Sequence, residues 1–241
     1  MDDSDVLKKV RDFYDHMYKE SGLDAQRRYP NEELCRFIEG CFSHYSHEQR
    51  KNIKILETGC GSGAHLWMLA KEGFDTYGID LSQEALLLCQ TMLDRYGVCA
   101  HLSCQNMADM SFFEAEFDVV LDVFSSYCLT KTQGEKYLKK VKEILRPGGF
   151  FFSYFPSKKS DAYQDRGQVH MIDADTLDSV SGRSAPFSPQ LYPCRFLYPR
   201  EYERALIGLG FDLYYSETVG KTYHQGKVFF EFIVIVGKKR I

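Results

Sequence analysis

This sequence has neither paired cysteine motifs nor an excess of basic residues, and both absences exclude classes of protein. Its eight cysteines are scattered and none forms a C-x-x-C pair. Neither a disulfide framework nor a zinc site is therefore indicated, and we expect a reducing compartment and no metal. An excess of basic residues is also absent, because 30 Lys and Arg stand against 34 Asp and Glu, for a net charge of −4. This balance gives no general attraction to nucleic acid or to anionic lipid.

Long apolar runs are missing as well. The longest stretch, 228–236, is interrupted by Glu231 and is far too short to cross a membrane. The first five residues, MDDSD, are acidic and lack the basic and apolar regions of a signal peptide. We therefore expect a cytoplasmic protein, monomeric or homodimeric, with neither a membrane nor a nucleic-acid partner.

What the sequence does contain is a regular alternation of short apolar runs and longer amphipathic stretches. Its 241 residues are enough for one α/β domain with a sizeable core. The alternation predicts a parallel sheet with helices on both faces, which binds its ligand beyond the carboxyl ends of the strands. The expected strands are 53–57, 75–79, 99–103, 117–122 and 149–155, and the expected helices are 64–72, 82–96 and 132–145.

The flanking segments follow other patterns. Apolar residues recur at helical spacing through 5–50, with a break at Ser21-Gly22. The pattern is lost after Pro156, and a helix beginning at Pro199 is followed by two final strands. We expect a single domain, 1–241, whose aromatic-rich flanks cover the sheet top. Its parts are an N-terminal helical lid (1–50), a core (51–155), an insert that forms a substrate lid (156–198), and a C-terminal helix with strands (199–241).

A glycine-rich loop is the clearest functional signal. The apolar run that begins at Ile53 reaches an acid, Glu57, and glycines follow at 59, 61 and 63. Such glycines let a ligand approach the backbone, and the helix that follows favours a negative group at its N-terminus. Asp80, about twenty residues further on, can accept hydrogen bonds from both hydroxyls of a ribose. These features fit NAD and S-adenosylmethionine (SAM) equally well.

Other features favour SAM. Glu57 could help to fix an ammonium group, which SAM has and NAD lacks. The stretch QNMADM at 105–110 precedes the strand FDVVLD at 117–122, and LRPGG at 145–149 joins a helix to a strand. With the glycine loop and Asp80, these make five motifs in the order and at the spacing of the class I SAM-dependent methyltransferases. Residues 53–155 therefore resemble that family.

The resemblance implies a Rossmann-like, doubly wound sheet of seven strands, mostly parallel with an antiparallel C-terminal strand. It also implies SAM as cofactor and S-adenosylhomocysteine (SAH) as product. Asn106 stands where the family usually has an acid beside the adenine amino group, and its carbonyl oxygen can still accept that hydrogen bond. The expected cofactor residues are Tyr18, Arg28, Tyr29, Glu57, Gly59, Cys60, Gly61, Gly63, Asp80, Leu81, Asn106, Met107, Ala108 and Asp122.

The acceptor is much less defined. The resemblance favours methyl transfer to a small molecule by in-line displacement, for which Tyr127, His170 and His224 are candidate bases. After Leu121 the chain reads DVFS, so the D/N-P-P-Y/F/W motif of nucleic-acid methyltransferases is absent. Protein or RNA methylation, SAM binding without catalysis and an NAD oxidoreductase remain as alternatives.

Overall fold

The main sheet contains seven strands and is built from most of the predicted β-segments. The computed structural model describes residues 3–180 and 190–241, so that part of the predicted insert, 181–189, lies outside the described residues. The strands are β1 (Lys54–Thr58), β2 (Asp75–Asp80), β3 (His101–Cys104), β4 (Phe117–Val123), β5 (Leu145–Pro156), β8 (Phe211–Tyr223) and β9 (Val228–Lys239), and β6 (Thr176–Leu177) pairs with β7 (Cys194–Arg195) in a separate ribbon.

The helices occupy the segments between the strands and the N-terminal region. They are α1 (Asp3–Ser21), α2 (Glu32–Phe42), α3 (His47–Arg50), α4 (Leu66–Lys71), α5 (Gln83–Tyr96), α6 (Lys131–Ile144), α7 (Asp161–Gln164) and α8 (Pro199–Gly208), with short 3-10 turns η1 (Leu23–Ala25), η2 (Met107–Asp109) and η3 (Ser126–Cys128). Side-chain caps explain several helix starts: Ser82 accepts a backbone hydrogen bond at the start of α5, and Thr130 forms a capping box with Gln133 at α6.

The strand order confirms the predicted topology. The sheet runs β3-β2-β1-β4-β5-β9-β8, with every pair from β3 to β5 parallel and β9 antiparallel to both of its neighbours. The direction of strand succession reverses at β1, which pairs with β2 on one side and β4 on the other. Loops that leave β1 and β4 therefore separate at the carboxyl edge, where ligands bind in such sheets.

Both faces of the sheet are covered, as the side chains of β5 show. Phe150 and Phe152 pack against Phe37 of α2, whereas Phe151 packs against Tyr137 of α6 and Phe155 against Tyr202 of α8. Successive side chains of a strand point to opposite faces, so α2 lies on one side of the sheet and α6 and α8 on the other. The second helix of the N-terminal region thus packs on the sheet.

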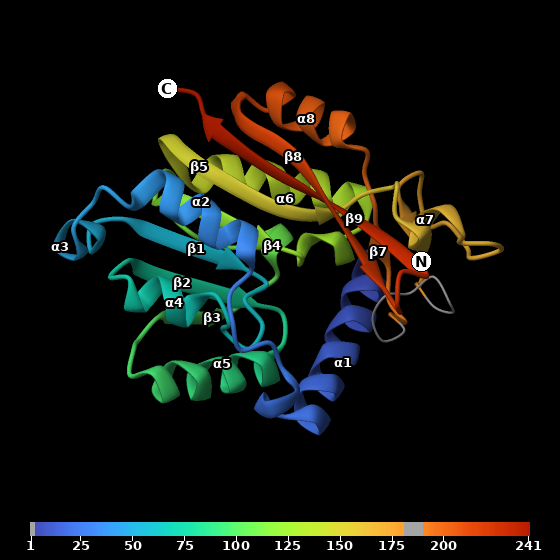
Figure 1. Cartoon of the computed structure of the whole chain (residues 1–241), viewed down its shortest axis with the longest axis horizontal. Coiled ribbons are helices and arrows are strands. Elements are labelled where there is room, and N and C mark those ends of the chain that lie inside the picture. Colours follow the sequence, from blue (N-terminus) through green and yellow to red (C-terminus); the bar gives the residue numbers. More distant parts are fainter. Residues whose placement is uncertain (1–2, 181–189) are drawn as a thin grey trace.

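Helix α1 has a different position, beyond the carboxyl ends of the parallel strands and beside α5 (Figure 1). Asp15 of α1 accepts a hydrogen bond from the Ser82 hydroxyl at the start of α5. Lys9 pairs with Asp178 of the insert at 3.1 Å. These contacts tie α1 across the edge of the sheet to which the glycine loop points.

Two boundaries differ from the sequence prediction for local reasons. Helix α4 begins at Leu66 because the tight turn of the glycine loop continues to Ala64 and His65 serves as the N-cap. The last two strands, predicted over 212–218 and 228–236, are longer and form one hairpin, whose turn at His224-Gln225-Gly226 has positive φ angles. In the described part of the chain, no helix is both long and apolar enough to cross a membrane.

Candidate functional site

The glycine loop after β1 takes a backbone path that only glycine adopts easily. Gly59, Gly61 and Gly63 have φ angles of +69°, +52° and +83°. A Cβ atom on Gly59 would lie 2.5 Å from the Ser125 Cβ, and one on Gly63 would lie 2.6 Å from the Cys89 Sγ. A Cβ on Gly61 would instead meet the Tyr18 hydroxyl at 2.8 Å. Two of the glycines therefore allow close packing, and Gly61 faces the covering helix α1.

Asp80, at the end of β2, is bonded to this loop. Its Oδ2 accepts the Gly61 N–H at 2.8 Å, and its Oδ1 accepts the Ser82 N–H at 2.9 Å. Burial raises the pKa of Asp80 to about 6, although these two N–H groups favour the ionised form. The carboxylate is thus held in one orientation, and each oxygen keeps a lone pair for a further donor.

A cavity of about 100 Å³ opens between α1 and the carboxyl edge of the sheet. Of the predicted cofactor residues, six line it: Tyr18, Gly59, Asp80, Leu81, Asn106 and Met107. They come from α1 and from the loops after β1, β2 and β3. The cavity is also lined by Tyr14 of α1 and by Phe124 and Ser125 after β4, which were not among the predicted cofactor residues.

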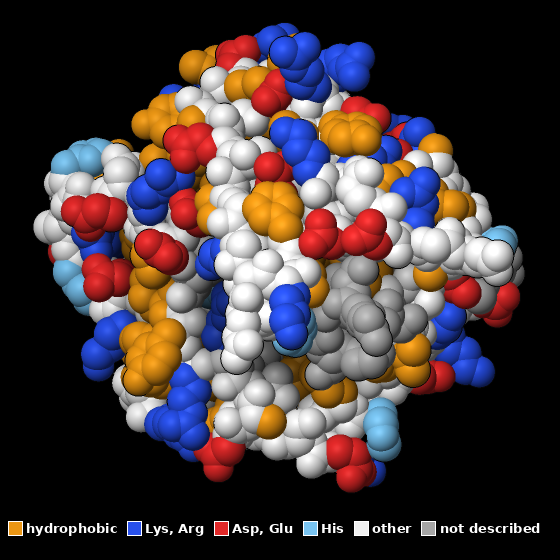
Figure 2. Space-filling view, turned by 45° about the vertical axis from the view of Figure 1, so that its right-hand side comes forward, with side chains coloured by type: hydrophobic (Ala, Val, Ile, Leu, Met, Phe, Trp, Pro, Cys, Tyr) orange, Lys and Arg blue, Asp and Glu red, His pale blue; other side chains and the backbone are white. Residues whose placement is uncertain are grey.

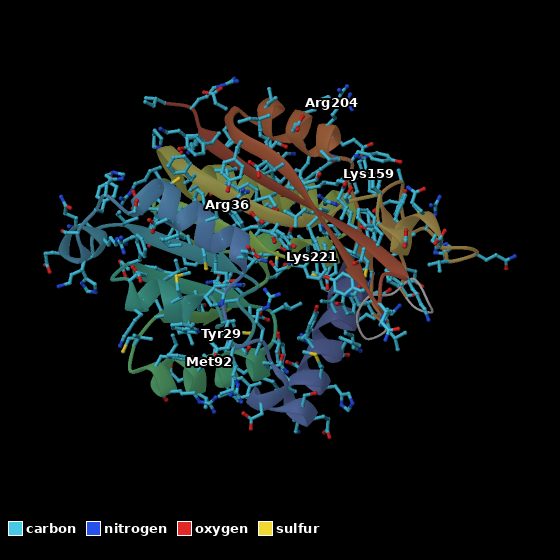
Figure 3. All side chains as sticks on the ribbon, in the orientation of Figure 1. Tyr29, Arg36, Met92, Lys159, Arg204 and Lys221 are labelled. Atoms are coloured by element: carbon cyan, nitrogen blue, oxygen red, sulfur yellow. The ribbon has the colours of Figure 1, made fainter. Side chains whose placement is uncertain are left out.

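Other predicted cofactor residues lie outside the lining of this cavity. Arg28 pairs with Asp24, four residues earlier, at 2.6 Å. Tyr29, labelled in Figure 3, is 72% exposed. Because these two side chains are turned to solvent, this arrangement gives no support to the prediction that they reach the cofactor. Cys60 and Ala108 are buried under the loops.

Asp122 lies at the carboxyl end of β4 with a fully buried side chain. Its carboxylate accepts hydrogen bonds from the N–H and hydroxyl groups of Ser125 and Ser126 and from the Ser153 hydroxyl. Ser125 also reaches the Thr58 carbonyl at the end of β1. Asp122 therefore fixes the shape of the loop after β4, which forms one wall of the cavity.

Three phenol hydroxyls meet beside the cavity. Tyr14 of α1 lies 3.1 Å from Tyr127 of η3 and 2.7 Å from Tyr192 of the insert, and the last two are 2.5 Å apart. Gln190 donates to the Tyr127 hydroxyl at 2.9 Å. Burial raises the pKa of all three phenols well above the ordinary value. They remain protonated at neutral pH, so Tyr127 is placed as a hydrogen-bonding group and is poorly suited to act as a base.

The two candidate histidines lie elsewhere. His170, in the insert, and His224, in the β8–β9 turn, are both exposed, and neither lines a described cavity. Among the described residues, no group of three or more His, Cys, Asp or Glu side chains could hold a metal ion. All eight cysteines are free thiols.

Comparison with known proteins agrees with this fold. A family model described as a methyltransferase domain matches residues 55–149. The chain is 29% identical over 157 residues to a protein of Geobacillus sp. (strain WCH70) that is named as a methyltransferase. The match covers 64% of this chain and 59% of that protein. The fatty-acid O-methyltransferase of Mycolicibacterium smegmatis is 34% identical over 101 residues, or 41% of this chain. The match spans only 35% of that enzyme.

Solved structures show the same architecture. The 1,6-didemethyltoxoflavin-N1-methyltransferase of Burkholderia thailandensis, with bound 1,6-didemethyltoxoflavin and SAH, superposes with a TM-score of 0.63 at 14% identity. The likeness covers 100% of this chain and 92% of that one. A SAM-dependent methyltransferase of Methanosarcina mazei gives a TM-score of 0.64 at 22% identity, over 78% and 92% of the two chains. At these identities the likeness establishes the fold.

Residues 55–149 match a methyltransferase-domain model, and the strand order is that of the class I SAM-dependent methyltransferase fold. SAM is the cofactor of the methyltransferases that share this fold. The residues at and next to the cavity fit this cofactor. Asp80 lines the cavity and keeps acceptor lone pairs. Outside the lining, Gly61 has no side chain to crowd Tyr18 of α1, and the buried Glu57 Oε2 has no hydrogen-bond partner among the described residues.

The raised pKa of Asp80 predicts a pH dependence of cofactor binding. In its ionised form Asp80 can accept hydrogen bonds from the two hydroxyls of a ribose, and protonation below a pKa of about 6 removes part of this capacity. The dissociation constant for SAH should therefore be about tenfold higher near pH 5 than near pH 7.5. Titration calorimetry at both pH values tests this. The Asp80→Asn variant should bind weakly with no such dependence, and an equal dependence in that variant would assign it to another group.

Proposed function

We propose that this protein transfers a methyl group from SAM to a small-molecule acceptor by in-line displacement. The observation that carries the proposal is the roofed cavity, in which Asp80 and the glycine loop lie on one side and α1 and the phenol cluster close the other. When bound, the cofactor supplies an electrophilic methyl group on a sulfonium. The residues around the cavity position the acceptor against this methyl group and exclude water.

The chemical character of the cavity wall supports an acceptor that needs no strong base. Tyr14, Phe124, Cys128 and Leu129 bring aromatic and apolar surface to the cavity. Burial keeps the phenol cluster protonated, and burial likewise raises the pKa of the Cys128 thiol to about 12. These groups can donate hydrogen bonds to an acceptor and orient it, but they are poor proton acceptors at neutral pH.

A small acceptor also suits the surface of the molecule better than a nucleic acid does. Figure 2 shows acidic and basic side chains mixed over one face, with no continuous basic patch there. Nucleic-acid binding draws most of its affinity from basic side chains that neutralise phosphates. The net charge of −4 provides no such excess. Methylation of a protein is the second candidate, and the same assay separates it.

The test uses SAM labelled in its methyl group. The protein is incubated with fractionated cell extract that supplies small metabolites, protein and RNA in separate pools. We expect label to appear in the small-molecule pool only when the intact protein is present. With the Asp80→Ala variant at the same SAM concentration, we expect no label in that pool. Label confined to protein or RNA would contradict the proposed acceptor class. If no pool received label although the protein bound SAH normally, the result would favour SAM binding without catalysis.

A further inference from the structure

A buried pair beneath the glycine loop consists of Glu57, near the end of β1, and His65, the N-cap of α4. The Glu57 Oε1 and His65 Nδ1 lie 2.5 Å apart. The two residues are only 1% and 7% exposed. The loop between them doubles back through three glycines, so that residues eight positions apart in the chain meet. Neither residue lines the cavity, whereas Gly59 in the loop between them does.

The hydrogen bond leaves two polar atoms unused. Glu57 Oε2 and His65 Nε2 are both buried and have no partner among the residues that the structure describes. Because a carboxylate oxygen accepts, Nδ1 must carry the proton that is donated. A neutral ring of this tautomer leaves a bare lone pair at Nε2, which costs less than an unpaired N–H of a charged ring would.

With the Glu57 carboxylate ionised and the His65 ring neutral, the pair carries a negative charge with one open oxygen. Within the described ranges, no Lys or Arg forms an ion pair with Glu57, and the contact with His65 is an ion pair only when that ring is protonated. Tyr18, Cys60 and Asp80 also interact electrostatically with Glu57, and none of these three is a cation. A buried carboxylate without a cation is costly, so Oε2 is arranged for a cation that arrives from outside the chain.

We propose that His65 is a positioning residue for the cofactor: its Nδ1–H holds Glu57 Oε1 and thereby presents Oε2 to the ammonium group of SAM. This rests on the cofactor of the family and adds to it a residue outside the glycine-loop motif. Without the His65 bond, the carboxylate is free to rotate about its terminal torsion, which has a broad range. The charge-assisted bond to the ammonium then loses its fixed geometry.

The experiment compares two ligands on four proteins by titration calorimetry. The ligands are SAH and its deamino analogue, which keeps the carboxylate and lacks the ammonium. The proteins are wild type, Glu57→Gln, His65→Leu and His65→Asn, whose side-chain amide can donate from nearly the place of Nδ1. We expect His65→Leu to weaken SAH by about tenfold or more and the deamino analogue by less than about threefold, since only SAH makes the charge-assisted bond.

The remaining variants sharpen the result. His65→Asn should keep SAH affinity within about threefold of wild type, because the donor is retained. A fifth protein carries both Glu57→Gln and His65→Leu. It should bind SAH no more weakly than Glu57→Gln alone, because the two changes disrupt the same interaction. Equal weakening of both ligands by His65→Leu would overturn the inference and reduce the pair to a structural contact.

Stability is checked by thermal unfolding of each variant. Should His65→Leu not fold, His65→Phe replaces it with a ring of similar shape that lacks the donor. Failure of both to fold, with His65→Asn folded, would assign the bond to stability and overturn the positioning role. If every His65 variant bound SAH with the affinity of wild type, the inference would also be overturned, while the proposed methyl transfer would be unaffected. Wild-type protein that binds no SAH would overturn both.

Discussion

Replacing Gly61 with valine is expected to abolish cofactor binding, with a loss of SAH affinity of about 100-fold or more. Gly61 has a φ of +52°, which a β-branched residue tolerates poorly. Its N–H also donates to Asp80 at 2.8 Å, so a change of φ would withdraw a fixed partner from that carboxylate. A side chain here would project toward the Tyr18 hydroxyl, into the space under α1.

A matched control separates loss of the site from general strain. Gly97, at the carboxyl end of α5, has a φ of +64° and no atom within 4 Å of an added Cβ. Gly97→Val should lose stability through comparable backbone strain, of about 1–2 kcal/mol, and keep its SAH affinity. Circular dichroism, thermal unfolding and calorimetry on both variants give the comparison. Normal SAH binding by Gly61→Val would mean that the loop does not face the ligand.

The parts of the site that could be predicted from the sequence are those fixed by strand ends. Gly59, Asp80 and Asn106 each follow a parallel strand within a few residues, so the fold alone brings them to one edge. Short-range patterns sufficed because the strands, the glycines and the acid lie within one continuous β/α alternation. The seven-stranded sheet and its antiparallel C-terminal strand, which the structure contains, were implied by the resemblance to the methyltransferase family.

The covering helix shows where this reasoning stops. Helical spacing indicates which face of α1 is apolar, but not which surface that face covers. Tyr18, which was predicted to contact the cofactor, lines the cavity. The hydrogen bonds of Tyr14 to Tyr127 and Tyr192 depend on segments 113 and 178 residues away. Those distances in sequence leave no local signal.

Arg28 illustrates the opposite case, in which a local signal was available. Asp24 lies four residues before it, a spacing that commonly produces an ion pair, and the structure contains that pair. His65 also left a signal, as a polar residue between Ala64 and Leu66 at the start of an apolar helix. Its partner Glu57 could not be inferred, because the path of the glycine loop decides which side chain it meets.

Asp80→Ala is expected to weaken SAH binding by about 2–4 kcal/mol, a factor of roughly 30 to several hundred, from the loss of charge-assisted hydrogen bonds to two ribose hydroxyls. The carboxylate is oriented by the N–H groups of Gly61 and Ser82, so it needs little reordering when the ligand arrives. Burial raises its pKa to about 6, which means that its charge is kept in the folded protein at a cost in stability. A carboxylate that is buried beside a cavity at a cost in stability is best explained by a role in ligand binding.

The control for this variant is Asp75→Ala, which removes the same side chain from the opposite end of the same strand, β2. Asp75 lies 3.5 Å from His101 and does not line the cavity. SAH affinity should stay within about twofold of wild type in Asp75→Ala, since a half-exposed ion pair of this kind contributes little. Both variants should fold, because each change lies at a strand end. If calorimetry near pH 7.5 showed less than about a threefold change for Asp80→Ala, corresponding to about 0.6 kcal/mol, the ribose contact would have to be assigned to another residue.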